Sequence, residues 1–293
     1  MRKAEKLMLV DLHIHSNNSS DAEFSVAEIM TQARALGIKT LAITDHNSVK
    51  GVAGAIKLGS TAGIRVIPGI EIDCAHEGVN LHLLGYNIDW NAPEFAELER
   101  KLFAKGAATL EPMIANMRAL GVNVGIGEVL AAANGQIPCA EHIAEVVLHK
   151  SEAADCEILR PYLSGGERSD MPYINFYWDY FSQGKPAYVP VEFMKLTDAV
   201  KLVKATGGIP VIAHPGANLK DNPEFIDKII AAGIEGVEIF NNYHTPEQQE
   251  YFAGKARQNN LLMTAGSDFH GKNKPKIQLG KYLCVDCSEI WRG

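Results

Sequence analysis

Two blocks of alternating strand-like and helix-like segments constrain the fold of this 293-residue chain more than any other feature. The first block contains predicted strands at 7–15, 39–44, 64–72 and 80–88, and predicted helices at 26–37 and 51–63. The second contains predicted strands at 187–191, 209–215, 234–240 and 261–268, and predicted helices at 197–208, 223–233 and from Thr245 onward. Ser25 and Glu28 form a capping-box pattern before the first helix, and Gly37 follows that helix. The alternation is typical of α/β proteins built around parallel strands.

The segment between the two blocks has a different pattern, with few runs of β-branched residues. Its helix-like stretches are 95–121, 140–150 and 174–184. Because the flanking blocks share a pattern that this segment lacks, we expect a helical insertion domain at 91–184. The two parts of a barrel would then lie at 1–90 and 185–293.

Composition and charge restrict the partners and the compartment. A formal net charge of −7 gives no overall basic field, so we expect no footprint for long double-stranded nucleic acid. No apolar run is long enough to span a membrane, and the four apolar residues before Asp11 are too few for a signal peptide. We therefore expect no membrane partner. Five cysteines, an odd number, fit the reducing cytoplasm, where Cys284 and Cys287 would be structural thiols.

The stretch Asp11-Leu12-His13-Ile14-His15 places two histidines on the same face of a predicted strand, because side chains alternate along a strand with a period of two. Two neutral imidazoles that crowd at a strand end have unmet lone pairs, and a divalent cation satisfies them well. A His-x-His pair by itself is a weak indication of a metal site. Whether this pair binds a metal therefore depends on the other potential ligands in the chain.

Polar side chains collect where the predicted strands end, which is where sites gather in α/β folds. Six of the ten histidines and three carboxylates lie at these ends or in the loops that follow. They are His13, His15, Asp21, His46, Glu71, His82, His214, Asp268 and His270. Each has an ordinary structural explanation when taken alone, but their joint placement calls for a shared cause, and metal binding supplies one. Nitrogen and oxygen ligands without sulfur favour zinc, manganese or iron.

These residues lie in short motifs that resemble the PHP superfamily, named for polymerase and histidinol phosphatase. The motifs are His13-x-His15, Thr44-Asp45-His46, Pro68-Gly69-Ile70-Glu71, His82, Ala213-His214-Pro215 and Gly266-Ser267-Asp268-Phe269-His270. They cover both flanking blocks. The resemblance implies a distorted (β/α)7 barrel with an inserted small helical domain, and a site for up to three divalent metal ions.

The resemblance also distributes the ligands among the ions. The first ion would be held by His13, His15, Glu71 and Asp268, the second by Glu71, His82 and His214, and the third by Asp21, His46 and His270. Asp45 would lie nearby as a supporting or proton-handling group.

Within the superfamily, the helical segment, residues 184–190 and the Gly-Ser-Asp-Phe-His-Gly ending resemble one branch most. Its members are metal-dependent phosphoesterases that act on nucleoside 3',5'-bisphosphates and short RNA ends. The implied partner is a small phosphorylated substrate, a nucleotide or a short RNA. Members usually carry an arginine shortly before a His-Ile-Ala helix, whereas residues 139–144 of this chain read Cys-Ala-Glu-His-Ile-Ala. This departure leaves the metal ligands unchanged and the exact substrate open.

The predicted reaction is hydrolysis of a phosphate ester by a hydroxide that bridges bound metal ions. Divalent ions lower the pKa of a bridging water toward neutrality and neutralise the charge that grows during in-line displacement. The leaving alkoxide needs a proton or a cation, and Asp45 and His244 are the candidate catalytic residues. His244 follows a predicted strand, so it could face the mouth of the site, and a helix-cap or surface role beside Thr245 is an equal alternative.

Other functions stay open at this point. An amidohydrolase-like hydrolase would share the His-x-His and terminal aspartate geometry, although its usual bridging lysine would sit where this chain has Glu71. A histidinol-phosphate-type phosphatase would differ in the alcohol that carries the phosphate. A non-catalytic metal-binding PHP module would be marked by lost ligands, and none is lost here.

Overall fold

A nine-stranded sheet forms the centre of the protein in the computed structural model, which describes residues 8–220, 222–280 and 282–284. The strand order is β8-β7-β6-β4-β3-β2-β1-β9, and β5 pairs with β3 outside this path. The strands are β1 Met8–Ile14, β2 Thr40–Ile43, β3 Arg65–His76, β4 Val79–Tyr86, β5 Met194–Lys195, β6 Ile209–Ile212, β7 Gly236–Phe240, β8 Leu262–Ala265 and β9 Tyr282–Cys284. Most neighbouring strands are parallel, so the predicted α/β class is confirmed.

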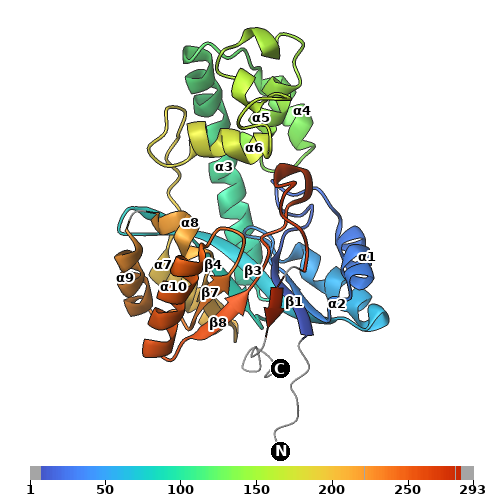
Figure 1. Cartoon of the computed structure of the whole chain (residues 1–293), viewed down its shortest axis with the longest axis vertical. Coiled ribbons are helices and arrows are strands. Elements are labelled where there is room, and N and C mark those ends of the chain that lie inside the picture. Colours follow the sequence, from blue (N-terminus) through green and yellow to red (C-terminus); the bar gives the residue numbers. More distant parts are fainter. Residues whose placement is uncertain (1–7, 221, 281, 285–293) are drawn as a thin grey trace, which may run out of the picture.

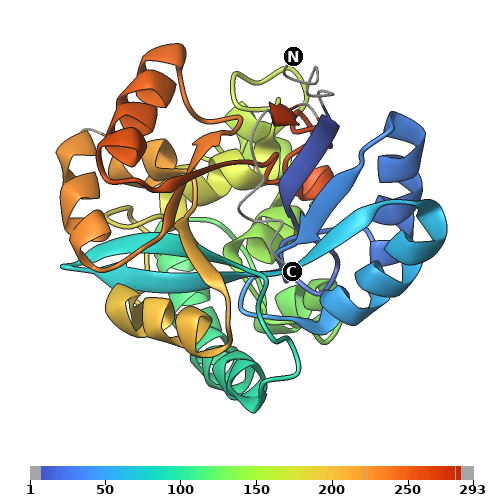
Figure 2. The same ribbon diagram turned by 90° about the horizontal axis from the view of Figure 1, so that it is seen from below.

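Helices flank this sheet on its outer side (Figure 2). They are α1 Val26–Leu36, α2 Lys50–Ala62, α7 Leu196–Ala205, α8 Pro215–Leu219, α9 Ile226–Ala231 and α10 Pro246–Gln258. Helix α1 begins at a capping box in which Ser25 and Glu28 bond to each other's backbone amides, and it ends at Gly37 with φ 78°. Thr245 and Gln248 form the same motif at the start of α10. These predicted helix boundaries are confirmed.

The helices between the two blocks form a second unit above the sheet (Figure 1). They are α3 Pro93–Ala119, α4 Ile126–Ala133, α5 Ala140–Leu148 and α6 Pro172–Phe176, and α6 continues into a π-helix at Tyr177–Phe181. Their apolar faces build a hydrophobic cluster of their own, around Met117, Ile143 and Phe176. Leu98 near the start of α3 belongs instead to the core that the sheet forms with α7, α9 and α10. Helix α3 therefore connects the two cores.

The segment after β8 lies against the end of β1. The Asp268 amide donates to the His13 carbonyl at 2.8 Å, and the His15 amide donates to the Phe269 carbonyl at 3.0 Å. The buried carboxylate of Asp11 accepts hydrogen bonds from the amides of Ser267 and Gly280, each at 2.8 Å. These bonds join the two outer parts of the sheet at one end. The complete (β/α)7 barrel stays a prediction.

Gly266 lies at this junction and has no room for a side chain, because an added Cβ would lie 2.3 Å from the His13 Cβ and 2.7 Å from the His13 nitrogen. We expect Gly266→Ala to lower the free energy of unfolding by about 1–3 kcal/mol, the usual cost of overpacking a core. Urea denaturation of the metal-free protein measures this loss. Gly254→Ala in α10 is the matched control, because a Cβ there meets nothing within 4 Å and alanine favours the helix. Equal unfolding free energies for the two variants would contradict the prediction.

One predicted strand is wrong. Residues 187–193 have no regular secondary structure, and only the two-residue strand β5 follows them. The reason is chemical, since Pro186 and Pro190 lack the backbone N–H that a sheet ladder needs. Single turns of 3-10 helix lie elsewhere, at Ala153–Asp155, Arg160–Tyr162, Pro223–Phe225 and Gly271–Asn273.

The expectations about membrane association and about the cysteines are tested only in part. Among the described residues, no helix has both the length and the apolar character needed to cross a bilayer. Cys284 lies in β9, whereas Cys287 lies outside the described residues. The predicted cytoplasmic location stays a prediction.

Candidate metal centre

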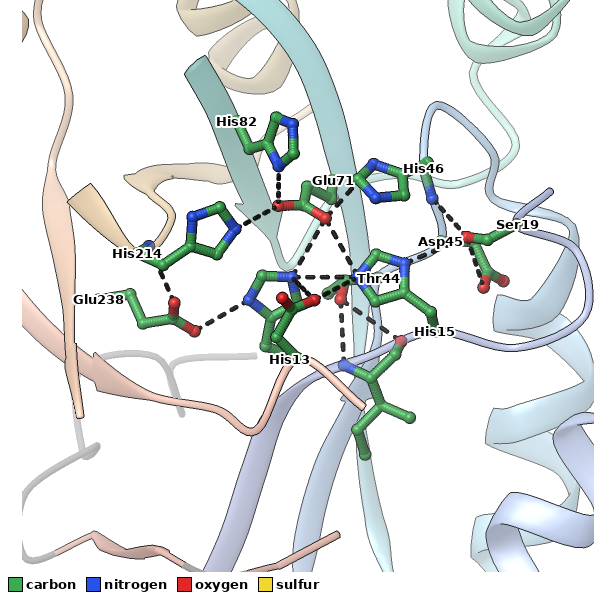
Figure 3. Close-up of polar contacts among 12 residues, drawn as sticks. His13, His15, Ser19, Thr44, Asp45, His46, Glu71, His82, His214 and Glu238 are labelled. Atoms are coloured by element: carbon green, nitrogen blue, oxygen red, sulfur yellow. Dashed lines mark hydrogen bonds and ion pairs between the residues drawn. The ribbon is translucent and has the colours of Figure 1, made fainter. Parts of the chain in front are cut away.

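All nine side chains that the sequence predicts as ligands converge beyond one end of the sheet, and Figure 3 shows the central ones. His13 lies in β1 and His15 follows it, Glu71 lies in β3 and His82 in β4, and the others follow β1, β2, β6 and β8. The alternation of side chains along β1 directs His13 and His15 to the same side, as expected. The structure therefore brings together residues from both sequence blocks.

The first cluster contains His13, His15, Glu71 and Asp268, and all four side chains are buried. The Oε2 atom of Glu71 lies 3.1 Å from Nε2 of both His13 and His15. Asp268 Oδ1 lies 3.4 Å from the same nitrogen of His13 and 3.2 Å from that of His15. Four potential ligand atoms thus face one another around a single point.

The second cluster uses the other oxygen of Glu71. Glu71 Oε1 lies 3.0 Å from His82 Nδ1 and 3.3 Å from His214 Nε2. Glu71 is therefore shared between two clusters, one on each carboxylate oxygen (Figure 3).

The third cluster contains Asp21, His46 and His270, and His15 also lies close enough to join it. Asp21 Oδ2 lies 3.1 Å from His270 Nε2 and 3.7 Å from His46 Nε2. The ring centroids of His15 and His270 are 4.0 Å apart.

The ligand-type atoms fit bound cations in two respects. Ligands that surround one ion at about 2.0–2.2 Å lie about 2.8–3.6 Å from one another in octahedral or tetrahedral arrangements, which matches most of these separations. Several buried polar atoms in the clusters also have no hydrogen-bond partner. They are Asp21 Oδ1, His46 Nδ1, Glu71 Oε2, His82 Nδ1 and His270 Nε2. Such atoms are costly to bury unless a cation or another partner satisfies them.

Outer contacts orient the histidines. His13 Nδ1 donates to Glu238 Oε1 at 3.0 Å, which leaves Nε2 to face the first cluster. His214 Nδ1 donates to Asn218 Oδ1 at 2.8 Å in the same way. Hydrogen bonds of this kind fix the tautomer and the ring orientation of metal-binding histidines.

Glu238 was not found by sequence reasoning. It is completely buried in β7, and its second oxygen accepts a hydrogen bond from the His214 amide at 2.9 Å. The one signal available was a charged residue within the apolar run at 234–240, which is rare in a buried strand unless the charge has partners.

Asp268 is held by two further residues that the sequence did not indicate. Lys274 Nζ donates to Asp268 Oδ2 at 2.6 Å, and the Tyr243 hydroxyl donates to the same oxygen at 2.5 Å. Burial opposes ionisation of Asp268, but Lys274 and His270 outweigh it and hold its pKa well below the usual range. Asp268 therefore stays a carboxylate with Oδ1 facing the first cluster.

Asp45 is buried and does not line the cavity above the clusters. Its Oδ1 accepts from the Ser16 amide at 2.6 Å and from the Ser19 hydroxyl at 3.3 Å, and its Oδ2 accepts from the Ser16 hydroxyl at 2.8 Å. Burial raises the pKa of Asp45 to about 7. Ser19 in turn accepts from His15 Nδ1 at 3.1 Å, so Asp45 supports the His15 ring through one intermediary.

We expect Asp45→Asn to lower kcat by more than about tenfold while metal content persists at saturating manganese. The amide would replace an acceptor by a donor against Ser16 and Ser19 and so disturb the loop that holds His15. Steady-state kinetics and elemental analysis of the same sample check both parts. Asp198→Asn, at an exposed carboxylate beside Lys201, is the control. An unchanged kcat would remove Asp45 from the mechanism.

His244 lies behind the site and does not line the cavity. Its Nδ1 donates to the Ile239 carbonyl at 2.8 Å, and its Nε2 accepts from the Gly216 amide at 2.8 Å. Burial lowers its pKa, which favours the neutral ring. Both ring nitrogens are thus engaged with the backbone, and its predicted proton transfer stays a prediction without supporting contacts.

A cavity of about 880 Å³ opens above the clusters, between the sheet and the helical unit. Five of the predicted ligands line it, and they are Asp21, His46, His82, His214 and Asp268. Its opposite wall contains Met113, Ile137, Tyr177 and Trp178 from the helical unit. Lys220 adds positive charge to the lining, whereas Lys50 pairs with Glu99, which also lines the cavity, at 2.8 Å. The fold and the site together define an α/β protein whose strand ends gather candidate cation ligands beneath a cavity.

Comparison with known proteins supports this description. Residues 11–117 match the family model described as PHP domain. This match covers the first block and the start of the helical segment, and it confirms the resemblance to the PHP superfamily that the motifs predicted.

Three curated relatives align over nearly the whole chain. A 3',5'-nucleoside bisphosphate phosphatase of Chromobacterium violaceum is 28% identical, covering 97% of this chain and 95% of the relative. The 5'-3' exoribonuclease Rnm of Escherichia coli is 29% identical, covering 97% and 93%. A phosphoribosyl 1,2-cyclic phosphate 1,2-diphosphodiesterase of Eggerthella lenta is 28% identical, covering 90% and 95%.

Two solved structures share the fold. A protein assigned as a metal-dependent phosphoesterase from Bifidobacterium adolescentis superimposes with a TM-score of 0.77 and 26% identity, covering 97% of this chain and 94% of the other. A protein described as an amidohydrolase from Chromobacterium violaceum, with bound sulfate and no metal, gives 0.74 and 26%, covering 92% and 89%.

Proposed function

We propose that this protein is a metal-dependent phosphoesterase that hydrolyses a phosphate ester of a nucleotide, such as a 3',5'-bisphosphate, or of a short RNA end. One observation carries the proposal. Imidazole and carboxylate atoms from nine residues cluster at separations typical of shared cation ligands, several of them without hydrogen-bond partners, beneath a cavity of about 880 Å³. The relatives that align over nearly the whole chain all act on phosphate esters, by their names.

We infer that the site holds up to three divalent ions, of manganese, iron or zinc, because its ligands are nitrogen and oxygen atoms and Glu71 is shared between two clusters. Bound divalent ions would supply an activated water at neutral pH and neutralise the charge on a phosphoryl group. The residues of the chain position that chemistry: Glu238 orients His13, and Lys274 keeps Asp268 ionised and turned toward the first cluster.

The cavity above the clusters suits a phosphorylated molecule with an apolar or aromatic part. Lys220 supplies local positive charge, which the chain as a whole lacks. Tyr177 and Trp178 line the opposite wall, and aromatic rings of this kind contact nucleobases well. Lys220 follows α8, and its Nζ lies 5.0 Å from the centre of the Trp178 ring, so a cation and an aromatic face meet where α8 approaches the helical unit.

A panel of substrates tests the proposal. The protein would be incubated with manganese, or with chelator, and with nucleoside 3',5'-bisphosphates, 5'-phosphorylated oligoribonucleotides, cyclic phosphodiesters, histidinol phosphate and amides. We expect manganese-dependent release of phosphate or nucleotide from the bisphosphates or the RNA ends. Faster turnover of histidinol phosphate would overturn the proposed substrate class. Hydrolysis of amides alone would favour an amidohydrolase, and full metal occupancy without any turnover would favour a non-catalytic module.

A further inference from the structure

Asp73 is a carboxylate outside the predicted ligand sets that lies between histidines of two different clusters. Its Oδ1 is 3.2 Å from Nδ1 of His46 and 3.5 Å from Nε2 of His82. It follows Glu71 by two residues in β3, so both side chains leave the same face of the strand. It is also the direct register partner of His82 in the β3–β4 hairpin. This period of two was the signal by which the sequence could have revealed it.

The carboxylate of Asp73 is held in one orientation by Asn47. The Asn47 Nδ2 donates to Asp73 Oδ2 at 2.8 Å, and the Asp73 amide donates to Asn47 Oδ1 at 2.9 Å. Asn47 itself is fixed by a bond from its amide to the Glu71 carbonyl at 2.7 Å. The first of these contacts occupies Oδ2 and the other two hold Asn47 in place, so Oδ1 is left facing the two histidines.

The position of Asp73 bears on which ring nitrogens of His46 and His82 carry a proton. A neutral imidazole has one lone pair and one N–H. In the third cluster, His46 faces Asp21 through Nε2, and in the second, His82 faces Glu71 through Nδ1. If those nitrogens bind ions, Nδ1 of His46 and Nε2 of His82 must carry the protons. Both of these nitrogens lie within 3.5 Å of the same Asp73 oxygen. His46 Nδ1 makes no hydrogen bond with any described residue. The carboxylate oxygens beside it are Asp73 Oδ1 at 3.2 Å and Glu71 Oε2 at 3.4 Å, and Glu71 Oε2 already faces the first cluster.

We propose that Asp73 is a positioning residue that selects the metal-binding tautomers of His46 and His82 and thereby links the second and third clusters. A carboxylate that accepts from the N–H of a ligand histidine orients the ring and raises its basicity. The proposal rests on the proposed function in one respect, since it requires bound divalent cations. An ion held by His46 Nδ1, Asp73 Oδ1 and His82 Nε2 would need the opposite tautomers and would remove both histidines from their clusters.

Metal binding by Asp73→Ala and Asp73→Asn tests this role. Equilibrium dialysis against manganese, with elemental analysis, gives the number and affinity of bound ions. We expect the ions of the second and third clusters to bind about ten- to a hundredfold more weakly in Asp73→Ala, while the ion of the first cluster is retained. Asp73→Asn keeps one acceptor oxygen and should fall between. Raising the manganese concentration should restore occupancy. Asp198→Ala, at an exposed carboxylate, should bind all ions as the unaltered protein does.

A spectroscopic readout separates positioning from general damage to the fold. In zinc-loaded protein with 15N-labelled histidine, long-range 1H–15N correlation spectra identify which ring nitrogen carries the proton. We expect protons on Nδ1 of His46 and Nε2 of His82, and a mixture of tautomers for both in Asp73→Ala.

Each contrary result has a distinct meaning. Unchanged affinities and tautomers in Asp73→Ala would overturn the inference and leave the proposed function standing. Loss of one whole ion with the others unaffected would make Asp73 a ligand instead. An unaltered protein that binds no cation would overturn the proposed function itself.

Discussion

Replacing Glu71 with glutamine should remove metal from the first and second clusters and lower kcat/KM by at least about a thousandfold. Glu71 is completely buried, and its two oxygens face different clusters, His13 and His15 on one side and His82 and His214 on the other. Glutamine keeps the size of the side chain but loses the negative charge, and its amide group turns a donor toward one of the clusters. A single change thus disturbs two cation positions at once.

Bound metal and kinetics, measured on the same preparation, check this expectation. Glu235→Gln is the matched control, because Glu235 is exposed and pairs only with Lys204 among the described ion pairs. Circular dichroism of the metal-free proteins shows whether the glutamine variant still folds. A Glu71→Gln protein with full metal content and unchanged kcat/KM would show that the shared carboxylate holds no ion.

Removing the bound cations with a chelator should abolish turnover and lower the stability of the fold. A ligand that binds only the folded protein adds about 2.7 kcal/mol of stability when present at a hundred times its dissociation constant. The ligands of the first cluster come from positions as distant as His13 and Asp268, so the unfolded chain cannot assemble them. The melting temperature should therefore rise with manganese concentration.

Thermal denaturation across a manganese series, with activity measured in parallel, tests this coupling. Magnesium is the useful comparison, because it prefers oxygen ligands and should raise the melting temperature less at a site rich in imidazole. Addition of manganese after chelation should restore both stability and turnover. Persistent turnover at full chelation, with a melting temperature that ignores manganese, would contradict a metal-dependent mechanism.

The sequence predicted the architecture well wherever local pattern and tertiary structure agree. The alternation in the first block and the capping box at Ser25 gave helices and strands close to those observed. The prediction of a strand at 187–191 was wrong because it followed the apolar residues and gave too little weight to Pro186 and Pro190. The segment instead connects the π-helix to β5, and an irregular connection of this kind has no periodic sequence pattern.

The site was predictable to the extent that strand ends converge in an α/β fold. That rule located nine of the ten side chains that cluster there without any contact information, and it missed Asp73. It could not locate Glu238, which lies within β7, or Lys274, which follows a 3-10 turn, because their roles depend on which atoms they contact. The orientation of His244 depends likewise on backbone groups of Ile239 and Gly216, which only the folded chain brings near its ring.

The bonds that join β1 to the segment after β8 have a consequence for how the protein matures. Ser267 binds Asp11 across 256 positions of the chain. Contacts between residues this far apart in sequence form slowly, because a long loop must close before they can stabilise the fold. During translation, His13 and His15 emerge long before Asp268 and meet an incomplete ligand set. Cations would therefore bind late, once the last strands have docked. A nascent chain that stalls earlier would lack part of the ligand set and would be prone to degradation.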